Sequence, residues 1–265
     1  MSGPSGNAER RIRLTLHYQG AAFRGWQAQP DARTVQGEVE RALVRLIGQR
    51  IPVVGAGRTD SGVHATGQVA SVMVPERWTA AELRRALNAV LPRDVWVAEA
   101  AETDPAFHAR YDAVARSYLY RVGLVDACFS PFERWRCWPQ DEPLDREVLD
   151  RAAAAFLGEH AFGAFAKTGQ PQRGERCTVQ CSEWRSWDEL GVTYHVRANR
   201  FLHHMVRYMV GTMVAAARGR RPVGDIAALL TGTASRTTSP PAPPAGLFLT
   251  RVHYRTGTES EDRQG

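Results

Sequence analysis

Alternating apolar and polar positions predict the first strand at residues 11–18. The apolar residues Ile12, Leu14 and Leu16 alternate there with polar ones. Such alternation is typical of a strand with one buried face. Apolar and β-branched runs predict further strands at 52–55, 68–74 and 94–100.

Two amphipathic helices are predicted between these strands. Thr34 is placed to cap a helix whose apolar stripe consists of Val35, Val39, Leu43 and Leu46. Thr79 and Glu82 have the spacing of a capping box and open a second helix that stops near Pro92. The resulting order, β-α-β-β-α-β, is that of a ferredoxin-like unit.

The rest of the chain repeats this order. We predict strands at 116–122 and 247–254, a hairpin of 177–187 with 192–198, and helices at 145–157, 202–217 and 223–230. We therefore expect an α+β fold of two ferredoxin-like (RRM-like) halves. These halves would form one broad, mostly antiparallel sheet with helices on one side and a central cleft, where a functional site would be expected.

The same patterns predict the domain organisation. We expect an N-terminal α+β half at 11–105, which carries a polar, glycine-rich loop at 55–65, and a C-terminal α+β half at 106–255. Residues 1–10 and 256–265 have the composition of disordered termini. Residues 231–246 are rich in Pro, Ser and Thr, which predicts a long surface loop.

Charge narrows the expected partners. The chain of 265 residues has 34 Lys and Arg against 28 Asp and Glu, a net charge of +6. This excess suits a polyanionic partner. Almost all cations are arginine, which codon bias explains for the bulk of the chain. Lys167 is the only lysine, which indicates that a primary amine has a function at that position.

The absence of certain sequence patterns predicts the cellular location of the protein and the chemical state of its cysteines. It has no apolar run of membrane-spanning length and no signal-peptide core near its first residues, so we expect a cytoplasmic protein. The four cysteines, Cys128, Cys137, Cys177 and Cys181, fit no zinc spacing. We expect them to be reduced structural thiols, and we expect no metal.

The densest group of reactive side chains lies at residues 55–65, Gly-Ala-Gly-Arg-Thr-Asp-Ser-Gly-Val-His-Ala. Its glycines permit tight turns between the flanking strands. Asp60 follows Arg58 by two residues, so an extended backbone would place both side chains on one face. A guanidinium nearby favours the ionised carboxylate, which can act as a nucleophile or a general base.

The same segment has two other interpretations. A structural Asx-turn accounts for most Asp-Ser-Gly triplets. An aspartic protease needs two such carboxylates. Asp60 lies in the only Asp-[Ser/Thr]-Gly triplet of the chain, so a protease would have to be a symmetric dimer, and the surrounding residues do not match that class, which we therefore do not favour.

Two further segments carry candidate residues. In the helix predicted from 202, His203 and Arg207 are four residues apart and would share a face. Metal ligation would need further partners, so we interpret this face, with His204, as polar and turned toward a cleft. Tyr118 is either an ordinary sheet-face residue or a ring that stacks on a flipped base.

The 55–64 segment closely resembles the signature of the bacterial tRNA pseudouridine synthase A family. Five other blocks resemble that family and occur in its order: Gly25-Trp26-Gln27, Phe107-His108-Ala109-Arg110, Arg116-Ser117-Tyr118, the segment from Asn199 to Arg207, and Gly246-Leu247-Phe248-Leu249. Together they cover the chain from about residue 11 to 254. Ser61 stands where many relatives carry Ala, and residues 169–176 match poorly.

The resemblance implies isomerisation of uridine to pseudouridine at positions 38, 39 and 40 of the tRNA anticodon stem-loop. It implies a homodimer that acts on tRNA without a cofactor or a metal. Asp60 aligns with the family's catalytic aspartate. The other aligned residues are implied to bind substrate: the stacking Tyr118, the cations Arg58, Arg207 and Lys167, and the apolar Leu247.

Two questions stay open from the sequence. Asp60 could attack C1′ of the ribose, attack C6 of the base, or abstract a ribose proton. A non-enzymatic RNA-binding protein built from two RRM-like units would show the same order of elements. Such units need exposed aromatic residues on central strands, and the 68–74 strand has none, so we favour the enzyme.

Overall fold

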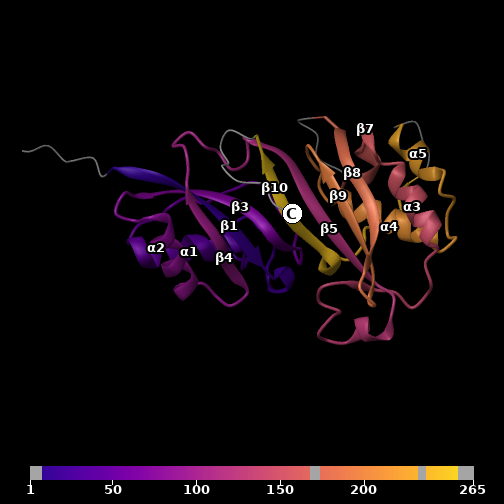
Figure 1. The fold of residues 1–265 in the computed structure, drawn as a ribbon, viewed down its shortest axis with the longest axis horizontal. Helices are drawn as coiled ribbons and strands as arrows, with labels where there is room; N and C mark the ends of the chain where they lie inside the picture. Colours follow the sequence, from indigo (N-terminus) through magenta and orange to yellow (C-terminus); the bar gives the residue numbers. More distant parts are fainter. Residues whose placement is uncertain (1–7, 168–173, 232–236, 256–265) are drawn as a thin grey trace, which may run out of the picture. The chain divides into compact units, whose positions relative to one another are not determined.

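The computed structural model describes residues 8–167, 174–231 and 237–255 (Figure 1). Disorder was predicted for 1–10 and 256–265, of which 1–7 and 256–265 lie outside the described residues, whereas Glu9 and Arg10 belong to a strand, so the prediction is wrong for these two. Positions 169–173 of the poorly matching segment and 232–236 of the predicted loop also lie outside the described residues. The chain divides into two compact units. Unit 1 runs to Val114 and resumes at Arg251, and unit 2 is Ala115–Thr250. The sequence placed this division at 105/106.

Unit 1 has the predicted order of elements. These are β1 (Glu9–Tyr18), α1 (Val35–Ile47), β2 (Val54–Gly55), β3 (His64–Pro75), α2 (Ala80–Val90) and β4 (Val95–Glu102). Strand β1 lies between β3 and β4 and is antiparallel to both, and the short β2 pairs with β3. Strand β1 begins at Glu9, before the predicted start, because Glu9 and Arg10 extend the ladder opposite Pro75 and Val74.

Local signals explain why these elements form. The Thr34 side chain accepts a hydrogen bond from the Gly37 backbone, and Thr79 and Glu82 form a full capping box. On β1 the predicted apolar face of Ile12, Leu14 and Leu16 is completely buried. These three predictions are confirmed.

A β-bulge interrupts the pairing of β1 with β3. Leu16 lies opposite Gln68, but Tyr18, two residues further along β1, lies opposite Ala65, three residues back along β3. Strand β3 therefore carries one extra residue at this point. The bulge lies immediately after the loop that contains Asp60.

Further elements lie in unit 2: β6 (Trp138–Pro139), α3 (Arg146–Ala154), β7 (Gly158–Ala161), β8 (Arg176–Trp187), β9 (Gly191–Ala198), α4 (Met205–Ala217) and α5 (Asp225–Leu230). Two strands cross the boundary between the units: β5 (Ala113–Gly123) begins in unit 1, and β10 (Leu247–Tyr254) ends there. Strands β5, β9, β8 and β7 pair successively and antiparallel. Helix α3 packs against α4 and β8. The 177–187 and 192–198 hairpin is confirmed as β8 and β9.

One predicted helix starts later than expected. Helix α4 begins at Met205 rather than 202, because His204 has a φ of 64°, in the left-handed region. His203 and His204 therefore precede the helix, and the helical face predicted to join His203 to Arg207 is wrong.

The fold class is confirmed as mixed α+β. The described strands form a ten-stranded, mostly antiparallel sheet in the order β4-β1-β3-β10-β5-β9-β8-β7, with β2 and β6 as additional partners of β3 and β5. The central cleft stays a prediction. Among the described residues, no helix has the length and apolar character needed to span a membrane.

Candidate active site

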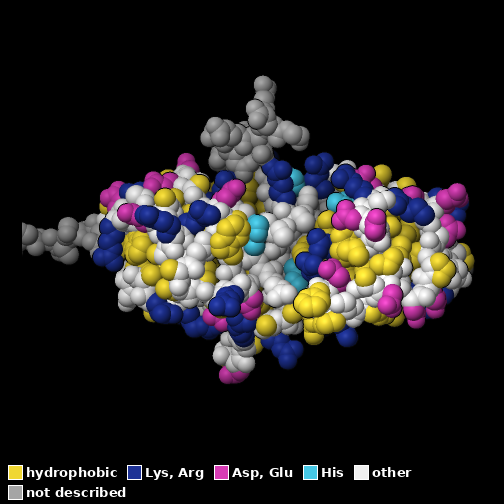
Figure 2. All heavy atoms as spheres, turned by 60° about the horizontal axis from the view of Figure 1, so that its bottom comes forward, with side chains coloured by type: hydrophobic (Ala, Val, Ile, Leu, Met, Phe, Trp, Pro, Cys, Tyr) yellow, Lys and Arg dark blue, Asp and Glu magenta, His cyan; other side chains and the backbone are white. Residues whose placement is uncertain are grey.

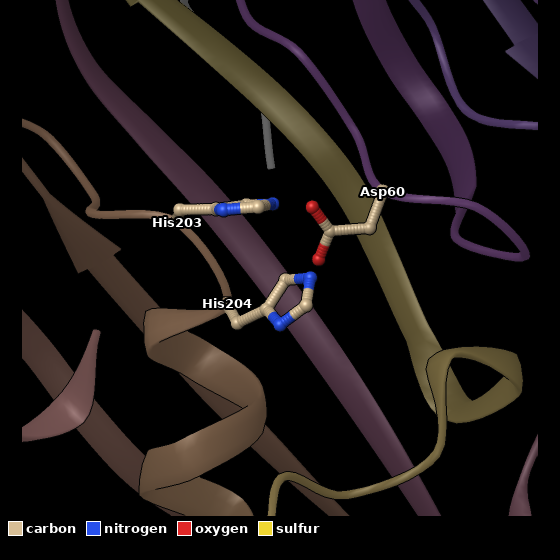
Figure 3. Close-up of side chains that lie close together, drawn as sticks. All are labelled: Asp60, His203 and His204. Carbon is tan, nitrogen blue, oxygen red and sulfur yellow. The ribbon is translucent and has the colours of Figure 1, made fainter. Parts of the chain in front are cut away.

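Asp60 lies on the loop of unit 1 that joins β2 to β3. Figure 3 shows its carboxylate projecting from this loop. The side chain of Asp60 is half-buried, whereas Arg58 is exposed. The predicted strand–loop–strand context is confirmed, and β3 begins earlier than predicted, at His64.

The residues that precede Asp60 are held from the core of unit 1. The Gln68 Nε2 donates to the Gly57 carbonyl at 2.9 Å. The Tyr18 hydroxyl lies 2.8 Å from the Thr59 Oγ1 in a buried hydrogen bond. The Trp26 backbone N–H donates to the Thr59 carbonyl at 3.1 Å. The chain therefore enters Asp60 along a fixed path.

The residues that follow Asp60 are held in the same way. The Phe23 carbonyl accepts from the Ser61 hydroxyl at 3.2 Å and from the Gly62 N–H at 3.3 Å. The Val63 N–H donates to the Asp60 carbonyl at 3.2 Å, which closes a turn. Gly62 is the third residue of that turn and has a φ of 81°, a conformation that favours glycine.

Close backbone approach explains the Gly25-Trp26-Gln27 block. Gly25 has a φ of 87°, and a Cβ at this position would lie 2.6 Å from the Thr59 carbonyl oxygen. The sequence alone indicates no role for this block. The structure shows that it supports the loop. His64 contributes from the other end, because its Nδ1 accepts from the Gly20 N–H at 3.1 Å.

The predicted substrate-binding residues Tyr118, Lys167, Arg207 and Leu247 belong to unit 2. Tyr118 is on β5, and its ring meets Phe201 edge-on with centroids 5.0 Å apart. The exposed Lys167 donates its backbone N–H to the His203 carbonyl at 3.1 Å. Both residues thus contact the segment that joins β9 to α4, which also carries the histidines of Figure 3. Phe201 lies in the block from Asn199 to Arg207, but no sequence pattern distinguishes it as a contact of Tyr118.

Two neighbouring tyrosines on β5 differ in accessibility. Tyr120 is fully buried, its hydroxyl donates to the Pro243 carbonyl at 2.8 Å, and burial raises its pKa well above the usual value. Tyr118 is only half-buried. Of the two, Tyr118 is therefore the one whose ring has a surface left for a ligand.

Arg207 connects α4 to the segment that precedes β10. Its Nε donates to the Ala242 carbonyl at 2.7 Å, and the Ala242 N–H donates back to the Arg207 carbonyl at 2.9 Å. Ala242 and Leu247 are both buried. The loop predicted on the surface at 231–246 is therefore packed against α4 over part of its described length.

Surface charge is mixed on the face that Figure 2 draws. Lys and Arg side chains are spread over it with Asp and Glu between them, rather than gathered in one continuous stripe. Any polyanion bound there would meet separate positive groups.

Comparison with known proteins gives concordant results. A family described as tRNA pseudouridine synthase matches residues 15–112 and 152–255. A protein of Maridesulfovibrio salexigens named tRNA pseudouridine synthase A is 39% identical over 250 residues, covering 92% of this chain and 90% of the relative. One of Moorella thermoacetica with the same name is 43% identical over 246 residues, covering 92% and 99%.

A solved structure, the archaeal box H/ACA sRNP Nop10-Cbf5 complex, gives a TM-score of 0.33 at 13% identity, covering 93% of this chain and 50% of the other. At that TM-score the likeness supports no argument about this chain.

Proposed function

The chain belongs to the tRNA pseudouridine synthase family, a family of isomerases, and from this premise we propose that it converts uridine to pseudouridine at positions 38, 39 and 40 of the tRNA anticodon stem-loop. We propose Asp60 as its catalytic residue. The observation that carries the proposal is the loop of Asp60, in which residues on both sides of the carboxylate are anchored to the core. Preorganised groups of this kind contribute strongly to catalysis.

The proposed reaction requires a nucleophile or a base. The N-glycosidic bond must break, the uracil must turn, and its C5 must join C1′ of the ribose. An ionised Asp60 would attack C1′, attack C6 or remove a ribose proton, and these three routes remain open. No cofactor or metal is needed in any of them, since atoms and electrons balance within the nucleoside.

Residues of unit 2 would hold the base. We propose that Tyr118 stacks on the uracil, since its ring is only partly covered, and that Leu247 provides an apolar contact. Arg58, Lys167 and Arg207 would meet phosphates or occupy the space of the flipped nucleotide.

The decisive experiment compares Asp60→Asn with Asp31→Asn. Asp31 is an exposed carboxylate of the same unit, so its variant controls for the loss of one negative charge. We expect purified protein in EDTA to form pseudouridine at 38–40 in several unrelated tRNA transcripts, read as carbodiimide adducts that stop reverse transcription. Asp60→Asn should lower the rate by roughly 10⁴-fold or more, whereas Asp31→Asn should not change it.

Three outcomes would reject the proposal: near-normal turnover of Asp60→Asn, modification at position 55 alone, or dependence on a metal. Tight tRNA binding without modification of any transcript would instead favour the binding-protein interpretation.

We also propose that the protein acts in the cytoplasm as a homodimer. Segment 124–136 of unit 2 exposes large apolar side chains, namely Leu124, Val125, Phe129, Phe132 and Trp135. It also carries both charge signs, with Glu133 paired to Arg136. A patch that combines apolar groups with both charges can meet a copy of itself across a twofold axis.

Light scattering tests this dimer. Phe132 is 82% exposed, so Phe132→Ser should leave the fold intact while lowering the average mass at a given concentration. An unchanged mass for this variant, or a monomeric wild type, would contradict the proposal.

A further inference from the structure

We propose that Gln68 is a positioning residue that holds loop 57–62 in the conformation that presents Asp60. The inference rests on the function proposed above. Gln68 does not belong to the loop. It lies on β3, after the bulge and opposite Leu16 of β1.

The contacts of Gln68 lead to the residues that precede Asp60. Its side chain is completely buried. Its Nε2 donates to the Gly57 carbonyl at 2.9 Å and lies 3.5 Å from the Tyr18 hydroxyl. The Tyr18 hydroxyl is in turn 2.8 Å from the Thr59 Oγ1. Two loop residues are thus held by one connected group of buried polar atoms.

Packing alone does not explain a glutamine at this position. Its Oε1 is buried and has no hydrogen-bond partner among the described residues. An unpaired buried acceptor is unfavourable for folding. Neighbours on the same strand face, Ala70 and Val72, are apolar and fully buried. An apolar side chain would avoid the penalty of the unpaired oxygen, so the feature that glutamine adds is its bond to Gly57.

The contacts of Gln68 predict that loss of its side-chain donor lowers the rate of the reaction without lowering the stability of the fold. Gln68 touches the loop backbone and is placed to act through the loop on Asp60. Without its N–H donor, loop 57–62 would sample more conformations while the apolar core stayed packed. The rate of the chemical step would then fall, and tRNA binding, which depends on other groups, would change little.

The test uses Gln68→Met, which keeps the length of the side chain and removes its donor. Ser71→Ala is the matched control, because Ser71 is also buried on β3, its hydroxyl also has no partner among the described residues, and it pairs with Arg13 and Val54 rather than with the loop. Tyr18→Phe is a second variant that removes only a hydroxyl from the same polar group.

Four measurements are made on the full chain: the melting temperature, hydrogen exchange of the backbone amides of Gly62 and Val63, kcat and KM. For Gln68→Met we expect an equal or higher melting temperature and exchange about tenfold faster in the loop, the factor that corresponds to one typical hydrogen bond. We expect kcat to fall by up to about 10²-fold with KM unchanged. Tyr18→Phe should shift exchange and kcat in the same direction, and Ser71→Ala should shift neither.

Unchanged loop exchange in Gln68→Met would overturn the inference. So would a lower melting temperature with faster exchange throughout unit 1, which would make Gln68 an ordinary core residue. The hydrogen-exchange result does not depend on the substrate. If the wild type left tRNA unmodified, the proposed function would fail, while exchange would still decide whether Gln68 holds the loop.

Discussion

Gly25→Ala should disturb the loop of Asp60 from the opposite side to Gln68. Gly25 has a φ of 87°, and an added Cβ would lie 2.6 Å from the Thr59 carbonyl oxygen and 3.2 Å from the Asp60 carbonyl carbon. Both neighbours are backbone atoms, so the loop itself must move. The displaced oxygen is the acceptor of the Trp26 N–H, so that hydrogen bond is weakened as well.

The magnitude follows from these two effects. A side chain in the left-handed region costs about 1–2 kcal/mol, and loss of one hydrogen bond costs about 1 kcal/mol. We therefore expect Gly25→Ala to lower the free energy of unfolding by roughly 2–3 kcal/mol. Because Thr59 and Asp60 move with the clash, kcat should also fall by up to about 10²-fold.

Gly48→Ala is the matched control. Gly48 ends α1 with a φ of 85°, yet a Cβ there meets nothing within 4 Å. Gly48→Ala should lower the free energy of unfolding only by the backbone cost, about 1–2 kcal/mol, and should keep the wild-type kcat. Urea unfolding with an unchanged m value gives the stability difference, and tRNA turnover gives the rate. Equal loss of stability in the two variants, or wild-type kcat in Gly25→Ala, would refute the reasoning.

Three further outcomes are expected. Tyr118→Phe should bind tRNA normally, whereas Tyr118→Ala should lose about 1–3 kcal/mol of binding free energy from stacking. Filter retention measures both affinities, and equal binding by the two variants would show that the ring has only a structural role. Tryptophan-fluorescence titrations should show tRNA affinity falling steeply with salt and less steeply in Arg58→Ala and Arg207→Ala, and a flat wild-type dependence would contradict phosphate contacts. Burial raises the pKa of Cys137 to about 12 and that of Cys177 to about 11. Both thiols therefore stay protonated at pH 8 and should resist iodoacetamide in the native protein, and their reactivity should rise only as the pH nears those values. Rapid labelling at pH 8, seen by mass spectrometry, would contradict that burial.

Local chemistry accounts for the parts of the fold that the sequence predicted well. The alternation of β1 and the caps at Thr34 and Thr79 depend on neighbouring residues, and all three were predicted. The predicted start of α4 was wrong, because His204 has a left-handed backbone. A glycine at that position would have signalled such a backbone in the sequence, but a histidine does not. Strands β6 and β7 have only two and four residues, too few to show a period.

The residues of the candidate site likewise fall into those that the sequence identified and those that it did not. Asp60 was identified because many reactive groups lie close together in the chain. Its supports were missed because Gln68, Tyr18 and Phe23 reach the loop only after β1 and β3 have paired. A buried glutamine in an apolar strand was the one available signal, and its meaning depends on the distance to Gly57.

The bulge between β1 and β3 constrains how this protein can vary in length. The Leu16–Gln68 and Tyr18–Ala65 pairs leave one surplus residue on β3, directly after the loop of Asp60. Removing one residue between 65 and 68 would close the bulge and keep both pairs in register, but it would also remove the local bend that a bulge adds beside the loop of Asp60. Adding one residue would enlarge the bulge or shift the ladder by one residue, which would exchange the two faces of the strand and turn Gln68 away from the core. A deletion in this segment therefore threatens the path of the loop, whereas an insertion also threatens the face on which Gln68 lies.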